Sequence, residues 1–289
     1  MLEFLEKGRY PKRRAMMPLI TITSGIGCGE MRIAKRVADG LELELYDDQR
    51  LQEKAVEMGL SLEDLKGFDE KAPGLFNRLL RRKPEVYLDV LDALIYEIAH
   101  QGEGILFGHG AQLLLRDFEC ALQVRIYSSE SSRINYLMNN QNLTHEAAEK
   151  MIHKTDNERS GFFQFAYHMD WNDPSLYDLI VNRDKLGEDS AAKLIIEVAQ
   201  SEVIAACSLS ALDSMERMSL LKKVQAAVLK NNISPLEFHI EVPEKGMVYI
   251  TGSLSPFDSE STLLEVLRSV PGVKEVTSEL VTPELDDIG

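Results

Sequence analysis

The chain has 289 residues, of which 44% are hydrophobic and 27% charged, a composition typical of folded globular proteins that excludes wholesale disorder. This length accommodates one large domain and one small one. The formal net charge of -15 opposes non-specific attraction to nucleic acid or anionic lipid, and we expect no nucleic-acid partner.

The beginning of the chain, residues 1–17, is a basic leader that lacks the apolar segment of a signal peptide. No stretch of the sequence reaches the ~20 apolar residues of a membrane span, and we expect a cytoplasmic protein. The three cysteines, Cys28, Cys120 and Cys207, form no disulfide framework and no C-x-x-C metal motif, so reduced thiols are expected. No i,i+4 or paired constellation with acidic neighbours is expected for His100, His145, His153, His168 and His239, and no metal site is expected.

A strand, a glycine-rich turn and a helix open the large domain, which is predicted over residues 18–206. Residues 18–23 are apolar and β-branched, and residues 31–41 carry apolar side chains at helical spacing. Strand-like and helical segments then alternate, which predicts a three-layer α/β fold around a mainly parallel sheet. The further expected strands are 43–46, 104–108, 121–127 and 177–182, and the further helices are 51–65, 86–100, 129–140, 144–154 and 188–206.

A serine-rich stretch after the last of these helices predicts a linker over residues 207–218. A small α+β domain is expected over residues 219–283, followed by a short tail, 284–289. Its elements follow the order α-β-β-α-β, with turns marked by Asn-Asn and Pro-Gly pairs. They are predicted over residues 220–229, 237–242, 247–251, 259–270 and 273–281.

The turn after the first strand is a candidate phosphate-binding loop. It carries three glycines and leads into a helix N-terminus, a layout that presents backbone N–H groups to phosphate. Glycine permits the close approach and the positive φ that such a loop needs. The alternative is a tight turn without a ligand. The candidate cofactor-binding residues are Gly25, Ile26, Gly27, Cys28, Gly29, Glu30 and Met31.

Two of these residues depart from a Walker-type loop, in which lysine and a hydroxyl residue follow the last glycine. Glu30 puts a carboxylate where lysine would reach the phosphates, and Met31 puts a thioether where a hydroxyl would hold Mg²⁺. The glycine loop still suggests ATP or another nucleotide as the cofactor. Mg²⁺ binding and efficient phosphoryl transfer are disfavoured.

Residues 18–206 resemble the cytidylate-kinase-like branch of the P-loop nucleoside monophosphate kinases. The stretches that carry this resemblance are 20–29, 32–34, 46–48, 104–111, 124–126, 154–159 and 170–182. The resemblance implies a donor nucleotide at the glycine loop and an acceptor nucleotide across a cleft. It also implies a mobile lid whose arginines surround the transferred phosphoryl group.

Three arginines are the candidate catalytic residues. Arg159 matches a lid arginine of the family, and Arg133 and Arg125 lie near the expected cleft. The alternative for both Arg125 and Arg133 is surface charge, with Arg133 paired to Glu130, three residues earlier on a helix. Trp171 and its aromatic neighbours are expected to pack the lid rather than to stack a base.

Asp47 and His109 are the candidate substrate-binding residues. Asp47 follows a strand end, where ligand-facing groups of α/β sheets lie, and its alternative role is to cap the next helix. His109 stands where the family carries an arginine. Gly110 provides no acid for Mg²⁺, and Gln164 stands where a second lid arginine is expected. The charge-stabilising groups are thus depleted at several places in one cleft.

Residues 219–282 resemble a BON domain, on the stretches 224–229, 246–252 and 270–276. The resemblance implies binding to membranes or small ligands. Because this stretch is rich in glutamate, we expect self-association, a protein partner or ligand sensing rather than attachment to lipid. Three functions remain open. The first is a regulatory protein that binds a nucleotide or phosphate ligand, with weak or no phosphotransfer. The second is an active nucleoside monophosphate kinase using ATP and a CMP-type acceptor, and the third is a structural adaptor acting through the BON-like domain.

Overall fold

The computed structural model describes residues 18–58, 84–204, 206–235, 237–255 and 258–281. The leader expected over 1–17 and the tail over 284–289 lie outside the described residues. So do residues 59–65 of the second expected helix.

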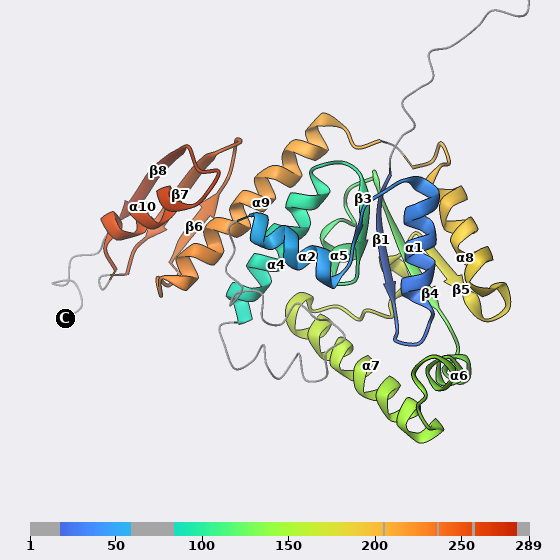
Figure 1. Cartoon of the computed structure of the whole chain (residues 1–289). Coiled ribbons are helices and arrows are strands. Elements are labelled where there is room, and N and C mark those ends of the chain that lie inside the picture. The colour runs from blue at the N-terminus through green and yellow to red at the C-terminus, as the bar shows by residue number, and fades with distance from the viewer. Residues whose placement is uncertain (1–17, 59–83, 205, 236, 256–257, 282–289) are drawn as a thin grey trace, which may run out of the picture.

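Five parallel strands form the sheet of the large unit, in the order β2-β3-β1-β4-β5 (Figure 1). Strand β1 is central and fully buried, with Leu19 opposite Gly104 on one side and Ala121 on the other. The strand order reverses direction beside β1, and ligands of such sheets bind at the carboxyl ends of strands near this point. The strands are β1 (Leu19–Ser24), β2 (Leu45–Tyr46), β3 (Gly104–Phe107), β4 (Ala121–Tyr127) and β5 (Leu179–Asn182).

Helices cover both faces of this sheet, which confirms the predicted α/β fold (Figure 1). Alternating residues of β1 point to opposite cores, because side chains of a strand alternate between its faces. Leu19 packs toward α4 and toward α9 (Leu209–Lys230), whereas Ile20 and Ile22 pack toward α1 and α8. The helices of this unit are α1 (Glu30–Leu41), α2 (Asp48–Glu57), α4 (Pro84–Ala99), α5 (Ala111–Leu114), α6 (Glu130–Gln141), α7 (His145–Tyr167) and α8 (Arg183–Ala199), with a 3-10 turn at Pro174–Leu176.

Helices α6 and α7 form a separate pair at the carboxyl edge of the sheet, packed through a small apolar core around Leu137 and Ile152. Helix α7 begins where the sequence predicts, because the Thr144 side chain accepts the backbone N–H of Ala147 at 3.2 Å. It runs on to Tyr167 instead of ending at residue 154. The matched lid stretch 154–159 therefore lies within a long helix.

A second sheet, with the order β6-β7-β8, forms the C-terminal unit (Figure 1). Strand β6 is antiparallel to β7, and β8 is parallel to β7. Helix α10 covers it, and the elements follow the predicted α-β-β-α-β order around their own core. The elements are β6 (Phe238–Glu241), β7 (Met247–Ser253), α10 (Glu260–Ser269) and β8 (Glu275–Val281).

The first helix of this unit, α9 (Leu209–Lys230), begins well before the expected residue 220. Residues 209–218, expected as part of a linker, are helical, since Ser208 caps the helix by accepting the N–H of Ala211 at 3.1 Å. Met215 packs into the core of the large unit, and Val224 packs into that of the small one. One continuous helix thus connects the two units.

Cys120 and Cys207 form a disulfide with a Cα–Cα distance of 4.8 Å, so the expectation of reduced thiols is wrong for this pair. The two residues are 87 positions apart in the sequence, and the fold brings the start of β4 against the chain entering α9. Cys28 is free and buried, and burial raises the pKa of its thiol to about 11. Throughout the described residues, no helix has the length and apolar character to cross a membrane.

Candidate phosphate-binding site

The loop between β1 and α1 lies at the carboxyl edge of the sheet, beside the strand-order reversal. Gly27 and Gly29 have φ values of 84° and 68°, in the left-handed region that glycine adopts without steric cost. Gly29 is the N-cap of α1 and offers no side chain to the first-turn N–H groups. This backbone is suited to an anion at the helix N-terminus.

Two charged side chains press against the loop. A Cβ on Gly25 would lie 2.7 Å from Nη2 of Arg133, and a Cβ on Gly29 would lie 2.7 Å from Oε1 of Glu188. A side chain at Gly25 would displace the Arg133 guanidinium, and one at Gly29 would displace the Glu188 carboxylate. A guanidinium covers one end of the loop and a carboxylate covers the other.

Arg133 is held by three hydrogen bonds. Its Nε donates to the carbonyl oxygen of Ile26 at 2.7 Å, and its two terminal nitrogens donate to Asp156 at 2.7 and 2.8 Å. The alternative pairing of Arg133 with Glu130 is wrong, because Asp156 reaches Arg133 from α7, 23 residues away. The bidentate geometry makes this a strong pair, so the positive charge beside the loop is largely neutralised.

Arg159 and Arg125 lie on the same indole ring. Their guanidinium carbons are 5.0 and 4.8 Å from the Trp171 ring centre. Arg159 also donates to the carbonyl oxygen of Ser24, at the end of β1. Arg125 is bound to Asn172, at 3.0 Å to its carbonyl and 2.7 Å to its side-chain oxygen. Arg133 and Arg159 thus both contact backbone carbonyls at the loop. Arg125 does not contact the loop and shares only the Trp171 ring with Arg159.

Trp171 is buried, as the packing expectation requires, with 3% of its surface exposed. Its Nε1 donates to Ser160 Oγ at 3.0 Å, and its carbonyl accepts the Tyr177 hydroxyl at 2.7 Å. The ring therefore orders α7 against the chain entering β5.

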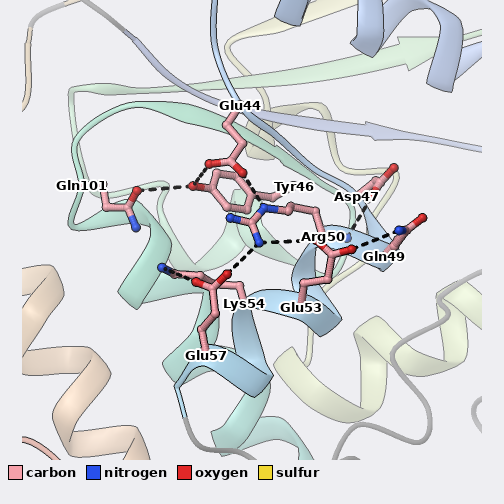
Figure 2. Close-up of polar contacts among 9 residues, drawn as sticks. All are labelled: Glu44, Tyr46, Asp47, Gln49, Arg50, Glu53, Lys54, Glu57 and Gln101. Carbon is pink, nitrogen blue, oxygen red and sulfur yellow. Dashed lines mark hydrogen bonds and ion pairs between the residues drawn. The ribbon is translucent and has the colours of Figure 1, made fainter.

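Asp47 acts as the N-cap of α2, which confirms its alternative role. Its Oδ1 accepts the backbone N–H of Arg50 at 3.0 Å, a contact visible in Figure 2. The neighbouring Asp48 contacts the buried His109, with 2.7 Å between Oδ1 and Nε2. This contact is absent from the sequence prediction. The sequence feature that indicates this Asp48–His109 contact is the glycine–histidine–glycine segment of residues 108–110, directly after β3.

Polar atoms are buried at the carboxyl end of β1, where the loop begins. Thr23 Oγ1 donates to Gln112 Oε1 at 3.0 Å, and both residues are almost fully buried. Among the described residues, the buried atoms Gln112 Nε2 and Ser24 Oγ have no hydrogen-bond partner. Such atoms are uncommon in folded proteins, and these two lie at or next to the carboxyl end of β1. The sequence analysis does not predict Gln112 as a site residue, although it is a polar residue next to a glycine-rich turn.

A second group of side chains lies on the α8 side of the loop. Glu188 pairs with Arg36 at 2.8 Å and with Arg32 at 3.7 Å. The guanidinium groups of Arg32 and Arg183 lie 5.7 and 5.0 Å from the ring centre of Tyr136. Helices α1, α6 and α8 thus bring two cations to one aromatic ring beside the loop.

Asp184 supports this edge from the start of α8. Burial raises its pKa, but hydrogen bonds from Ser128 and from the Ser129 side chain and backbone outweigh burial and lower it to about 2. The backbone N–H of Ser129 donates to Asp184 at 3.0 Å. The carboxylate therefore ties the end of β4 to α8 in its charged form.

His153 lies beside two glutamates, so the expectation that it has no acidic partners is wrong. Glu149 and His153 are one turn apart on α7, and Glu130 approaches from α6, so that their ligand atoms lie within 4.8 Å of one another. The i,i+4 spacing was the sequence signal. Glu130 and His153 are exposed, and the group lies outside the loop.

The central parallel sheet and the glycine loop after β1 define the fold of the P-loop kinases. A sequence profile of the cytidylate kinase-like family matches residues 19–185, more than half of the chain, and the chain belongs to that family. The match ends before α9, so the C-terminal sheet lies outside it.

Individual relatives agree with this assignment. A cytidylate kinase from Methanothrix thermoacetophila is 27% identical over 172 residues, which cover 59% of this chain and 91% of the relative. One from Pyrobaculum islandicum is 23% identical over 182 residues, covering 63% and 92%. Among solved structures, an uncharacterized protein from Eubacterium ventriosum has a TM-score of 0.51 and 22% identity, covering 65% of this chain and 99% of that one. The last comparison shows the shared fold alone.

Proposed function

We propose that the chain is a regulatory protein that binds a nucleotide or phosphate ligand at the loop of residues 25–31, with weak or no phosphoryl transfer. The observation that carries this proposal is the state of Arg133. Its guanidinium is already bound to the carboxylate of Asp156 and to a loop carbonyl. Efficient transfer needs cationic groups directed at the phosphoryl group.

Carboxylates at the loop support the same proposal. Glu30 opens α1 and is 8% exposed, and Glu188 lies against Gly29. Their charges repel a triphosphate, and neither Glu30 nor Met31 supplies what a Walker-type loop uses for the phosphates and Mg²⁺. The glycine geometry still favours an anion, so ligand binding survives the loss of these groups in this proposal.

The active-kinase alternative rests on the meeting of Arg133 and Arg159 at the loop. In that alternative ATP is the donor and a CMP-type nucleotide the acceptor, and Arg159, Arg133 and Arg125 provide the catalytic charge. Asp47 and His109 remain the proposed substrate-side residues, with Asp48 orienting the imidazole.

One experiment separates these functions. The purified protein is mixed with ATP, Mg²⁺ and CMP, dCMP or UMP, and ADP release and thermal unfolding are measured. A nucleotide-dependent rise in Tm without turnover supports the regulatory function. Turnover that Arg159→Ala abolishes, while the exposed control Arg268→Ala does not, supports the kinase. If no nucleotide raises Tm, both nucleotide functions are wrong.

For the C-terminal unit we propose a BON-like domain over residues 219–283, joined to the kinase-like domain of residues 18–206. Its separate core around Val248 and Leu263 supports an independent unit, and helix α9 supplies one side of that core. This unit is proposed to self-associate, to contact a protein partner or to sense a ligand. The adaptor function rests on it alone.

A further inference from the structure

A cavity of about 490 Å³ lies between the kinase-like unit and the C-terminal unit. The C-terminal end of α2 forms one wall, α4 and α9 form another, and two turns of the small unit close it. Its volume is in the range of roughly 300–1,000 Å³ that small-molecule sites occupy. It shares no residue with the glycine loop.

Positive charge exceeds negative charge in this cavity, within a chain whose net charge is -15. Five cationic and three acidic residues line it. A cationic cavity on an acidic protein attracts anions against the overall field. The cations are Lys54, Arg217, Lys223, Lys245 and Lys274, and the acids are Glu57, Glu97 and Glu216.

Each acid is paired with one lysine. The distances are 3.2 Å from Lys54 to Glu57, 2.7 Å from Lys223 to Glu97 and 2.6 Å from Lys245 to Glu216. These pairs leave Arg217 and Lys274 as the excess cations of the lining.

The two excess cations differ in their contacts. Arg217 contacts Asp213 and donates to the carbonyl oxygens of Val242 and Pro243. Lys274 is exposed, and no ion pair is found for it among the described residues. Its carbon chain lies against Gly246, where a Cβ would come within 2.9 Å. The turn therefore holds the lysine stem beside the cavity while its charge remains unpaired.

The same cavity has an apolar part and two exposed backbone turns. Met58, Leu220 and Pro271 provide apolar surface. Gly246 and Gly272 have φ values of 82° and 100°, so each turn needs glycine. A ligand that matches this lining carries an anionic group at one end and an apolar or aromatic group at the other.

We propose that this cavity is a second binding site, which takes a small phosphate ester with an apolar or aromatic part. Lys274 is the unpaired cation that neutralises the phosphate, and Lys245, which is ion-paired with Glu216, adds a second positive charge beside it. Leu220 and Pro271 contact the apolar part. The proposal does not depend on nucleotide binding at the glycine loop, because the two sites have no residue in common.

The cavity also has a structural connection to β2, which Figure 2 shows. Arg50 donates to Glu57 at 3.0 Å and is ion-paired with Glu44, whose carboxylate accepts the Tyr46 hydroxyl at 2.8 Å. The Glu57 carboxylate is shared by Lys54 and Arg50, so a phosphate that draws Lys54 away from Glu57 changes the charge balance of this network. Helix α2 carries the cavity residues at one end and the Asp47 cap at the other.

The test uses the full chain with phenyl phosphate as the probe and inorganic phosphate as the comparison. Backbone amide shifts of Gly246 and Gly272 are followed by nuclear magnetic resonance, because both residues line the cavity. Saturable shifts are expected, with tighter binding of phenyl phosphate than of inorganic phosphate. Arg133→Ala, at the glycine loop, leaves them unchanged.

The variant Lys245→Gln with Lys274→Gln is expected to weaken phenyl phosphate binding at least about tenfold, because two cations are lost. The matched control is Lys150→Gln with Lys193→Gln, two exposed lysines on α7 and α8. If the double variant does not fold, Lys274→Gln alone gives the same comparison. Absent shifts at both glycines, or equal affinities of variant and control, overturn the proposal.

Discussion

Arg133 of α6 and Asp156 of α7 are joined by two parallel hydrogen bonds of 2.7 and 2.8 Å, and the same guanidinium lies against Gly25. The pair connects the α6–α7 helices to the glycine loop and reduces the positive charge there. The Asp156→Asn variant removes one negative charge and keeps a hydrogen-bonding side chain. We expect its affinity for ATP to rise about tenfold, since about 1.4 kcal/mol of repulsion is removed.

Titration calorimetry without Mg²⁺ measures this affinity. Arg133→Ala is expected to change it in the opposite direction, and Asp117→Asn, at an exposed position, is the matched control. Equal ATP affinities for Asp156→Asn and the unaltered chain would show that this carboxylate does not limit binding at the loop.

Glu30 is the second electrostatic obstacle at the loop. It is nearly buried at the first position of α1, where a negative charge interacts well with the helix but poorly with a phosphate. Glu30→Lys places a cation where a Walker-type loop has one. Nucleotide affinity is expected to rise by tenfold or more, on the order of 1–2 kcal/mol. The increase in Tm with ATP measures it, and Glu197→Lys on the exposed face of α8 controls for net charge. A smaller ligand-dependent shift in Glu30→Lys than in Glu197→Lys would contradict this account.

The sequence predicts the fold well because the fold is encoded in local patterns. Apolar strands alternate with amphipathic helices, and the turn glycines stand directly after β1. These patterns give the parallel sheet, the loop and the second sheet. Helix ends were less predictable, since α7 and α9 continue through polar stretches that tertiary packing keeps helical.

The contacts of the candidate site were not predictable in the same way. Asp156 is 23 residues from Arg133, and Glu188 reaches Gly29 from another helix. Such pairs depend on how helices cross, which hydrophobic periodicity does not specify. His109 and Asp48 face each other for the same reason, 61 residues apart.

The disulfide between Cys120 and Cys207 closes a long segment of chain. Closing a loop of this length lowers the entropy of the unfolded chain, which stabilises the folded state by up to about 4.6 kcal/mol at 25 °C. Cys207→Ser is therefore expected to lower the urea midpoint, and a reductant is expected to lower it for the unaltered chain but not for the variant. Thiol titration of the denatured protein should find one reactive thiol, Cys28, before reduction. Three thiols before reduction, or equal midpoints, would contradict the prediction.

Asp92 on α4 gives the chain a pH-dependent stability. Burial raises its pKa to about 6, although Lys222 lies 3.2 Å away and opposes the shift. The unfolded pKa is about 3.9, so the folded state binds the proton more tightly. The protonated Asp92 carboxyl therefore stabilises the folded state fully below about pH 4. This stabilisation declines as the pH rises toward 6 and is lost above that.

The Asp92→Asn variant removes this titration. Its free energy of unfolding, relative to the unaltered chain, should increase by about 3 kcal/mol between pH 4 and pH 7, because about two pKa units separate the folded and unfolded states. Urea unfolding across this range measures the difference, and Asp39→Asn, at an exposed position of α1, is the control. If the difference for Asp92→Asn stays constant with pH, as it should for Asp39→Asn, then Lys222 keeps Asp92 charged over the whole range.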